Sequence, residues 1–87
     1  MDTKKIYWVA DCGHEWLVVP AKQARKISGI SSFSYISPAG TIAYLEGDCD
    51  APLFIEQFEL DGVEFGTPKV YENKAPCRNY PQYTAGR

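Results

Sequence analysis

The sequence predicts an α+β domain, a small two-layer sandwich in which two helices cover a mainly antiparallel sheet. Short segments rich in β-branched and aromatic residues recur between turn residues, as strands do. Two other segments begin with helix-start signals and end at glycine. The elements follow in the order β-β-α-β-β-α with a late edge strand, an order that places the helices on one face of an antiparallel sheet.

The chain of 87 residues holds one domain at most. We expect a single α+β domain in residues 1–72, with short edge strands in residues 63–65 and 69–71. Residues 73–87 contain prolines, glycine and scattered tyrosines, which indicate an irregular basic tail. So small a chain has little core to spare. A deep enclosed active site would therefore be hard to build, and surface recognition is favoured.

The first half of the chain predicts a hairpin followed by a helix. Strand-forming residues fill positions 6–10 and 16–19, and the aspartate and glycine within residues 11–14 favour a turn between them. A helix is expected over residues 20–28, because proline suits the first helical position. Gly29 suits the left-handed residue that ends such a helix.

The second half predicts another hairpin and a second helix. Residues 32–37 and 41–45 have strand character and are joined by a Pro-Ala-Gly turn. Asp50 is expected to cap the following helix through its side chain, and Gly62 is expected to end it. The side chains expected to be largely buried are Trp16, Tyr44, Leu53, Phe54 and Phe58.

The formal net charge is −2, but the charge is unevenly distributed. Residues 41–72 contain eight acidic side chains and one basic side chain, Lys69, whereas residues 73–87 contain basic residues and no acid. Because an acidic surface disfavours nucleic acid and attracts basic partners, we predict a partner protein with a basic surface. The residues expected to bind it are Glu46, Asp48, Glu56, Glu59, Arg78 and Tyr80.

No apolar run approaches the length that crosses a bilayer, so we expect no membrane association. The apolar run in residues 6–10 is too short for a signal peptide. The chain has three cysteines, and this odd number fits a reducing compartment better than a set of disulfides. These features predict a cytoplasmic protein.

Cysteine and histidine offer two alternative chemistries. Cys12, His14, Cys49 and Cys77 are suitable ligands for one tetrahedral zinc ion, but no Cys-x-x-Cys pair is present. Cys12 and His14 are also two residues apart, so a nucleophile and its base could point the same way. Nothing in the sequence supplies an oxyanion hole. We expect no metal, no cofactor and no catalysis, with a thiol- or metal-dependent enzyme using Cys12 and His14 as the alternative.

Three carboxylates alternate around Gly47, at positions 46, 48 and 50. Oxygen ligands in such a pattern could hold a hard cation. However, the residues that follow do not complete a calcium loop. Acidic side chains are also favoured where a helix begins. We therefore interpret this pattern as the start of the second helix.

A set of short motifs suggests a family. It comprises Gly13-His14, Trp16-Leu17, Val19, Ser34-Tyr35, Tyr44-Leu45-Glu46 and Asp48-Cys49-Asp50. With these motifs the chain resembles short uncharacterised proteins encoded by bacteriophages and prophages, across residues 6–60 and again at Arg78-Asn79-Tyr80. The chain departs from that pattern at Gly47, where the family has an acid, and at Cys12, where it has proline. The resemblance implies a mobile-element origin and a bacterial host, but no mechanism.

Three function classes remain open. The first is a non-enzymatic module that occupies a host protein, such as a component of a defence system, through an acidic face; the defence assignment rests on the resemblance alone. The second is the small enzyme that uses Cys12 and His14. The third is an assembly protein that forms homo-oligomers through exposed sheet edges.

Overall fold

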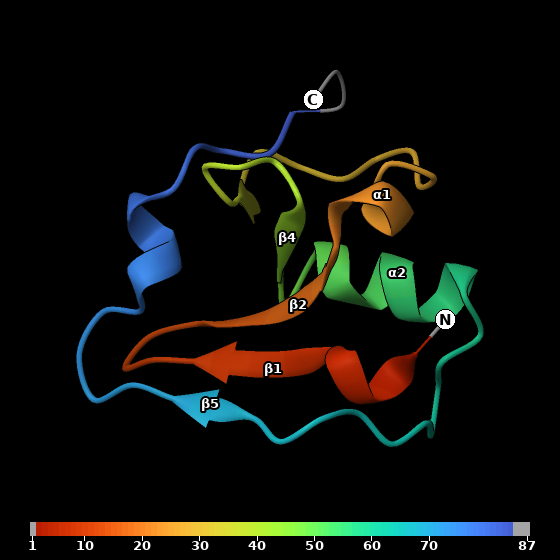
Figure 1. Cartoon of the computed structure of the whole chain (residues 1–87), viewed down its shortest axis with the longest axis horizontal. Helices are drawn as coiled ribbons and strands as arrows, with labels where there is room; N and C mark the ends of the chain where they lie inside the picture. The colour runs from red at the N-terminus through yellow and green to blue at the C-terminus, as the bar shows by residue number, and fades with distance from the viewer. Residues whose placement is uncertain (1, 85–87) are drawn as a thin grey trace.

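A computed structural model describes residues 2–84 of the chain. In chain order the elements are η1 (Thr3–Lys5), β1 (Tyr7–Ala10), β2 (Glu15–Pro20), α1 (Ala21–Ala24), β3 (Tyr35–Ile36), β4 (Ile42–Glu46), α2 (Asp50–Gln57), β5 (Lys69–Val70) and η2 (Pro76–Asn79). The strands form a five-stranded sheet in the order β3-β4-β2-β1-β5 (Figure 1). The predicted small α+β fold is confirmed. No helix in residues 2–84 is long and apolar enough to cross a bilayer.

The centre of the sheet is the antiparallel pair of β2 and β4, whose register runs from Trp16 opposite Glu46 to Pro20 opposite Ile42. β1 and β3 are antiparallel to β2 and β4 respectively, so both predicted hairpins are confirmed. β5 is the late edge strand, and it lies parallel to β1. Of the two edge segments predicted from sequence, only the one that contains Lys69 forms a strand.

One face of the sheet packs against the two helices (Figure 1). Because side chains alternate along a strand, Leu17 and Val19 of β2 and Leu45 of β4 share this face. They form a buried cluster with Phe54 of α2 and Ala24 of α1. The main hydrophobic core lies here.

The opposite face of the sheet is covered by the segment after residue 72. Trp16 and Val18 of β2 point to this side and form a second buried cluster with Ala75 and Cys77. The predicted irregular tail thus contains the short helix η2 and packs on this face of the sheet as far as Tyr80, whereas Tyr83 is buried in the cluster on the helix face. Residues 85–87 lie outside the described part of the chain.

The first helix is shorter than predicted, with four residues in α1. Pro20 precedes it and provides no side-chain cap, and after Ala24 the chain continues in i→i+3 turns such as Ile27 N–H to the Ala24 carbonyl at 3.0 Å. Because no side chain caps the first turn of α1, extending this helix beyond Ala24 would add little to its stability. Gly29 then reverses the chain with a φ of 93°, as its position suggested.

Asp50 does not cap α2, contrary to the sequence prediction. The position before the helix is occupied by Cys49, and Asp50 is the first helical residue, with only 1% of its surface exposed. Its carboxylate accepts hydrogen bonds from the backbone N–H of Ser31 (3.1 Å), the hydroxyl of Ser31 (2.7 Å) and the hydroxyl of Ser34 (2.5 Å). These bonds hold residues 31–34 in a bend, which explains why β3 is shorter than the predicted strand.

Three of the five predicted core side chains are less buried than expected. Trp16 and Phe54 are buried as predicted. Tyr44 and Phe58 are partly buried, and Leu53 is 37% exposed. The apolar stripe predicted on α2 is therefore narrower, because Ala51 and Phe54 are the apolar side chains of this eight-residue helix that are fully buried.

We predict that Phe54→Ala lowers the free energy of unfolding by about 3–5 kcal/mol, because it leaves a cavity under α2. Leu53→Ala, on the exposed side of the same helix, should cost less than about 1 kcal/mol. Urea denaturation followed by tryptophan fluorescence measures both values. Similar losses for the two variants would mean that the buried face of α2 is wrongly assigned.

We also predict that Asp50→Ala costs about 3 kcal/mol, because the buried hydroxyl of Ser34 and the N–H of Ser31 lose a charged acceptor. Asp48→Ala is the matched control. It removes an exposed carboxylate two residues away and should cost less than about 0.5 kcal/mol. A loss for Asp50→Ala no greater than that of the control would contradict the buried network.

Candidate functional site

The six residues predicted to bind a partner fall into separate regions of the structure. Glu46, Asp48 and Arg78 lie near the end of the sheet where β4 ends and β2 begins. Glu46 and Arg78 line one pocket, and Asp48 lines an adjoining depression together with Glu46. The structure therefore brings half of the predicted set together.

The other three predicted residues lie elsewhere. Glu56 and Glu59 line a depression beside α2 together with Leu53. Tyr80 packs its ring against Tyr44 with 5.4 Å between centroids, on the face of the sheet opposite the helices. Burial, reinforced by Tyr80, raises the pKa of Tyr44 to about 12. Tyr80 contributes to packing in this position.

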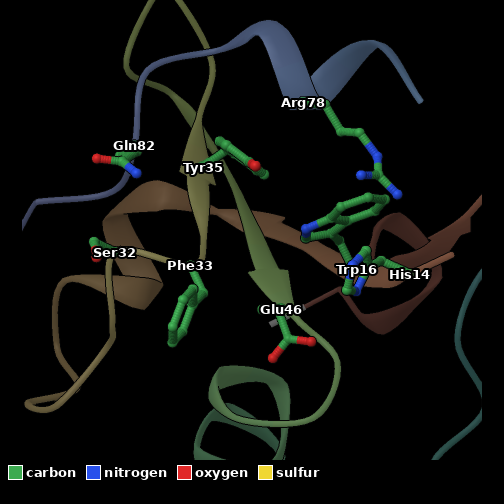
Figure 2. Close-up of a pocket in the computed structure, with 8 residues that line it drawn as sticks. All are labelled: His14, Trp16, Ser32, Phe33, Tyr35, Glu46, Arg78 and Gln82. Carbon is green, nitrogen blue, oxygen red and sulfur yellow. The ribbon is translucent and has the colours of Figure 1, made fainter. Parts of the chain in front are cut away.

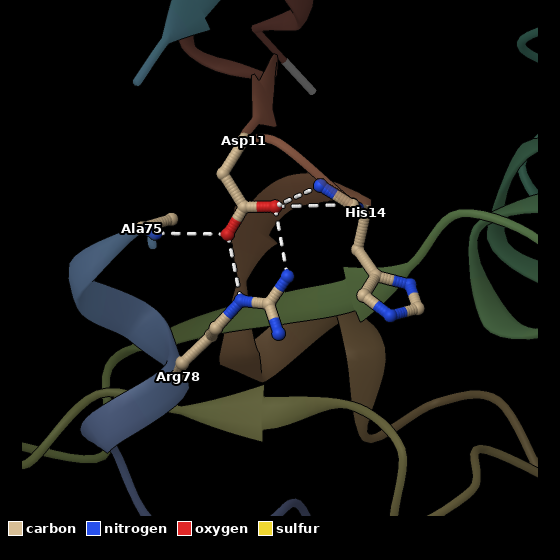
Figure 3. Close-up of polar contacts among 5 residues, drawn as sticks. Asp11, His14, Ala75 and Arg78 are labelled. Carbon is tan, nitrogen blue, oxygen red and sulfur yellow. Dashed lines mark hydrogen bonds and ion pairs between the residues drawn. The ribbon is translucent and has the colours of Figure 1, made fainter. Parts of the chain in front are cut away.

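Arg78 is held by Asp11, a residue in the β1–β2 turn that the sequence analysis did not select (Figure 3). Arg78 Nε donates to Asp11 Oδ2 at 2.6 Å, and Nη2 donates to Oδ1 at 2.9 Å. The N–H of Ala75 donates to Oδ2 at 2.9 Å, and Gly13 and His14 each donate to Oδ1 at 3.0 Å. The Asp11 side chain is fully buried and that of Arg78 is 24% exposed.

This ion pair has an electrostatic consequence. Arg78, followed by the backbone donors, holds the pKa of the Asp11 carboxyl far below its usual range, although burial acts in the opposite direction. The sequence analysis selected Arg78 as a binding residue. In the structure its side chain anchors the C-terminal segment to the turn and also lines the pocket.

A pocket of about 320 Å³ opens beside this anchor (Figure 2). Its aromatic wall comprises Trp16, Tyr35 and His14, with the Tyr35 ring centroid 6.2 Å and the His14 centroid 6.0 Å from that of Trp16. Arg78 lies over the indole, with Cζ 5.3 Å from the ring centroid. Phe33, at the pocket's mouth, is 67% exposed.

Trp16 carries the unusual feature of this pocket. Only 2% of the residue is exposed, yet its indole Nε1 is buried and has no hydrogen-bond partner within residues 2–84. Figure 2 shows this nitrogen on the ring edge that faces Tyr35, Phe33 and Glu46. A buried donor without an acceptor costs about 1–3 kcal/mol, so such groups are rare without a reason.

Glu46 provides an acceptor at the rim of the pocket. Its Oε2 accepts from the backbone N–H of Asp48 at 3.1 Å and of Cys49 at 2.9 Å, which fixes the side chain where α2 begins. Among residues 2–84, no N–H donor is bonded to its Oε1. The pocket therefore has a donor at its floor and a carboxylate oxygen at its edge.

The candidate metal ligands do not converge. Cys12 and Cys49 are exposed and Cys77 is buried, and no group of three histidine, cysteine or acidic side chains within residues 2–84 is close enough to share an ion. Burial raises the pKa of Cys77 to about 11, and the Glu46 carboxylate raises that of Cys49. Protonated thiols are poor metal ligands and poor nucleophiles.

Within residues 2–84 no hydrogen bond joins the Cys12 thiol to the His14 imidazole, and the backbone N–H of His14 donates to Asp11. The imidazole packs beside the indole of Trp16 instead. Sequence reasoning missed Trp16, Phe33 and Tyr35 as site residues. Aromatic residues in strands and turns usually belong to a core, and their sequence positions contain no sign of an unpartnered indole.

The Asp11–Arg78 pair predicts a pH-dependent stability. The folded pKa of Asp11 is depressed, so its contribution is fully present above the unfolded pKa of about 3.9 and is lost as pH falls towards the folded pKa. Asp11→Asn should therefore lower the urea midpoint strongly at pH 7 and progressively less below pH ~3.9. A constant difference between wild type and variant from pH 7 to pH ~2.5 would contradict the ion pair.

Comparisons of this chain with protein-family models, curated proteins and solved structures gave no match. Function must therefore be inferred from the side chains, their contacts and their charges.

Proposed function

We propose that this chain is a non-enzymatic binding module that engages a partner protein through the end of the sheet that contains the Trp16 pocket. The observation that carries the proposal is the buried indole N–H of Trp16, which faces the pocket and has no partner within residues 2–84. An external acceptor would remove the cost of leaving this donor unpaired. The resemblance to phage and prophage proteins extends the proposal to a cytoplasmic protein of a bacterial host.

The charge around the pocket supports a basic partner. Glu15 and Asp48 are exposed beside Glu46, because β2 begins where β4 ends. The N–H of Gly47 donates to the Glu15 carbonyl at 2.9 Å, and a Cβ at position 47 would lie 3.1 Å from that oxygen. Glycine thus allows the two segments to approach closely.

We call these three carboxylates, Glu15, Glu46 and Asp48, the acidic rim; Glu46 lines the Trp16 pocket, and all three line the depression that adjoins it. None of them takes part in the ion pairs found within residues 2–84. Unneutralised charges at a rim attract a partner of opposite sign and mainly raise the rate of association. Phe33, exposed beside the rim, adds a large apolar side chain of the kind that anchors protein interfaces.

Two other surfaces of the chain support the proposal less well. Glu56 and Glu59 form a second acidic region beside α2, but the side chains lining their depression include no unpartnered buried donor within residues 2–84. The enzyme alternative rests on Cys12 and His14, which share no hydrogen bond there. Support for the enzyme alternative would require a measurable reaction of the wild-type protein that is lost in the Cys12→Ser variant.

The experiment is affinity capture of a partner from a bacterial lysate, followed by measurement of association rates at low and moderate salt. The double variant Glu15→Lys/Asp48→Lys should slow association by about tenfold or more at low salt, with a smaller effect at moderate salt, because ions screen exposed charges. The matched control is Glu56→Lys/Glu59→Lys, which makes the same charge change beside α2 and should leave the rate within about twofold of wild type.

Two results would contradict the proposal. One is a partner whose association depends on Glu56 and Glu59 but not on the acidic rim. The other is a partner lost on Lys74→Glu alone, which would move recognition to the C-terminal segment.

A further inference from the structure

We propose that the Trp16 pocket receives a primary carboxamide, the side-chain group of an asparagine or glutamine. The inference rests on the proposed function in one respect, namely that a partner protein carries this group. The pocket itself dictates the chemistry, because its floor donates hydrogen bonds and its rim accepts them.

The floor of the pocket requires an acceptor. The indole Nε1–H of Trp16 is buried and unpaired within residues 2–84. Arg78 lies over the same ring and uses Nε and one N–H of Nη2 to bind Asp11, so its remaining donors are on Nη1 and Nη2. A ligand atom that reaches the floor must therefore carry lone pairs.

The rim of the pocket requires a donor. Glu46 is fixed by two backbone N–H groups on Oε2, and no N–H donor within residues 2–84 is bonded to Oε1. A carboxylate at the edge of a pocket binds donors and repels anions. The ligand group must therefore offer an acceptor and a donor together.

This requirement excludes most side-chain chemistries. Carboxylates and phosphates carry only acceptors and would face the acidic rim. Lysine and arginine carry only donors and would leave the indole unpaired, as would apolar side chains. A hydroxyl carries its donor and its acceptor on a single oxygen, whereas a primary carboxamide carries a carbonyl oxygen and two N–H donors on separate atoms of one planar group and can meet the floor and the rim at once.

The depth of the pocket favours a side chain over the backbone. Because Nε1 of Trp16 is buried, an acceptor reaches it only when a side chain of the pocket wall shifts, and the group at the end of a projecting side chain needs the smallest opening. A backbone amide continues as chain on both sides and would not enter as far. The volume of about 320 Å³ is ample for a glutamine side chain, whose methylenes would lie against Tyr35 and the exposed Phe33.

The test uses NMR of the two indole N–H groups in ¹⁵N-labelled protein. Trp8 is the internal control, because it packs in the cluster on the helix face of the sheet, away from the pocket. The probes are the N-acetyl methylamides of glutamine, glutamate, lysine and norleucine. The glutamine probe should shift the Trp16 resonance saturably, with a dissociation constant on the order of 1–10 mM for so small a ligand.

Variants of residues that line the pocket test whether the change in the Trp16 chemical shift comes from binding of the probe in the pocket. Glu46→Gln keeps an oxygen for the two backbone N–H groups but removes the charge, and should weaken binding of the glutamine probe by about fivefold. Phe33→Ala removes an exposed wall without touching the core and should weaken it by a similar factor. Glu56→Gln is the control, with the same charge change beside α2, and should bind the probe as wild type does. An unchanged Trp8 resonance verifies the fold of each variant.

Several outcomes would overturn the inference. One is an equal response to all four probes, which would indicate that the pocket binds the backbone of the probe. The second is a preference for the glutamate or the lysine probe. The third is that the Trp16 resonance does not shift at up to about 100 mM glutamine probe. Cytidine also carries a donor and an acceptor, and a tighter response to it would identify the pocket as a nucleobase site instead. If the probes fail while partner association still depends on the acidic rim, only the carboxamide inference is lost.

Discussion

The ion pair between Asp11 and Arg78 is the interaction on which the rest of the structure depends. Asp11 lies in the β1–β2 turn and satisfies two N–H groups of that turn, while Arg78 and Ala75 bring the last part of the chain to the same carboxylate. One buried carboxylate thus orders the turn and fastens the C-terminal segment across the sheet. Because all its hydrogen-bonding capacity is used by the protein, its burial is tolerated.

The candidate site is a consequence of this anchor. Arg78 can lie over Trp16 only because Asp11 fixes its guanidinium, and Cys77 covers the same face of the sheet. Tyr35 forms a further wall through β3, whose outer edge is bridged to Gln82 of the same C-terminal segment. The pocket therefore lies between parts of the chain that are distant in sequence, and it would not exist in residues 1–72 alone.

A second buried carboxylate, Asp50, acts in the same way on the other side of the sheet. It draws Ser31 and Ser34 towards the start of α2, and Ser34 in turn accepts the N–H of Glu46 at 2.9 Å. This network delays the start of β3 until Tyr35 and positions Phe33 outside the fold. Two acidic residues that the sequence placed in a turn and at a helix cap thus determine the shape of the pocket's walls.

The sequence by itself determined the local elements of this protein. Alternation and turn residues predicted the two hairpins, and the residues around Asp50 located the start of α2, because these depend on contacts between near neighbours in the chain. The predicted end of this helix at Gly62 was wrong, since α2 ends at Gln57. The same signals overextended the first helix and the β3 strand, and they presented Asp50 as the cap of α2.

Only the tertiary structure decided which charged groups form ion pairs and which buried donors lack an acceptor. Asp11 and Arg78 are separated by 67 positions, so nothing in their local sequence shows that they meet. The indole of Trp16 is an ordinary core residue in the sequence, and it becomes a site residue because no acceptor within residues 2–84 reaches it. Pairing of buried polar groups depends on distances across the fold, which periodicity and spacing along the chain do not encode.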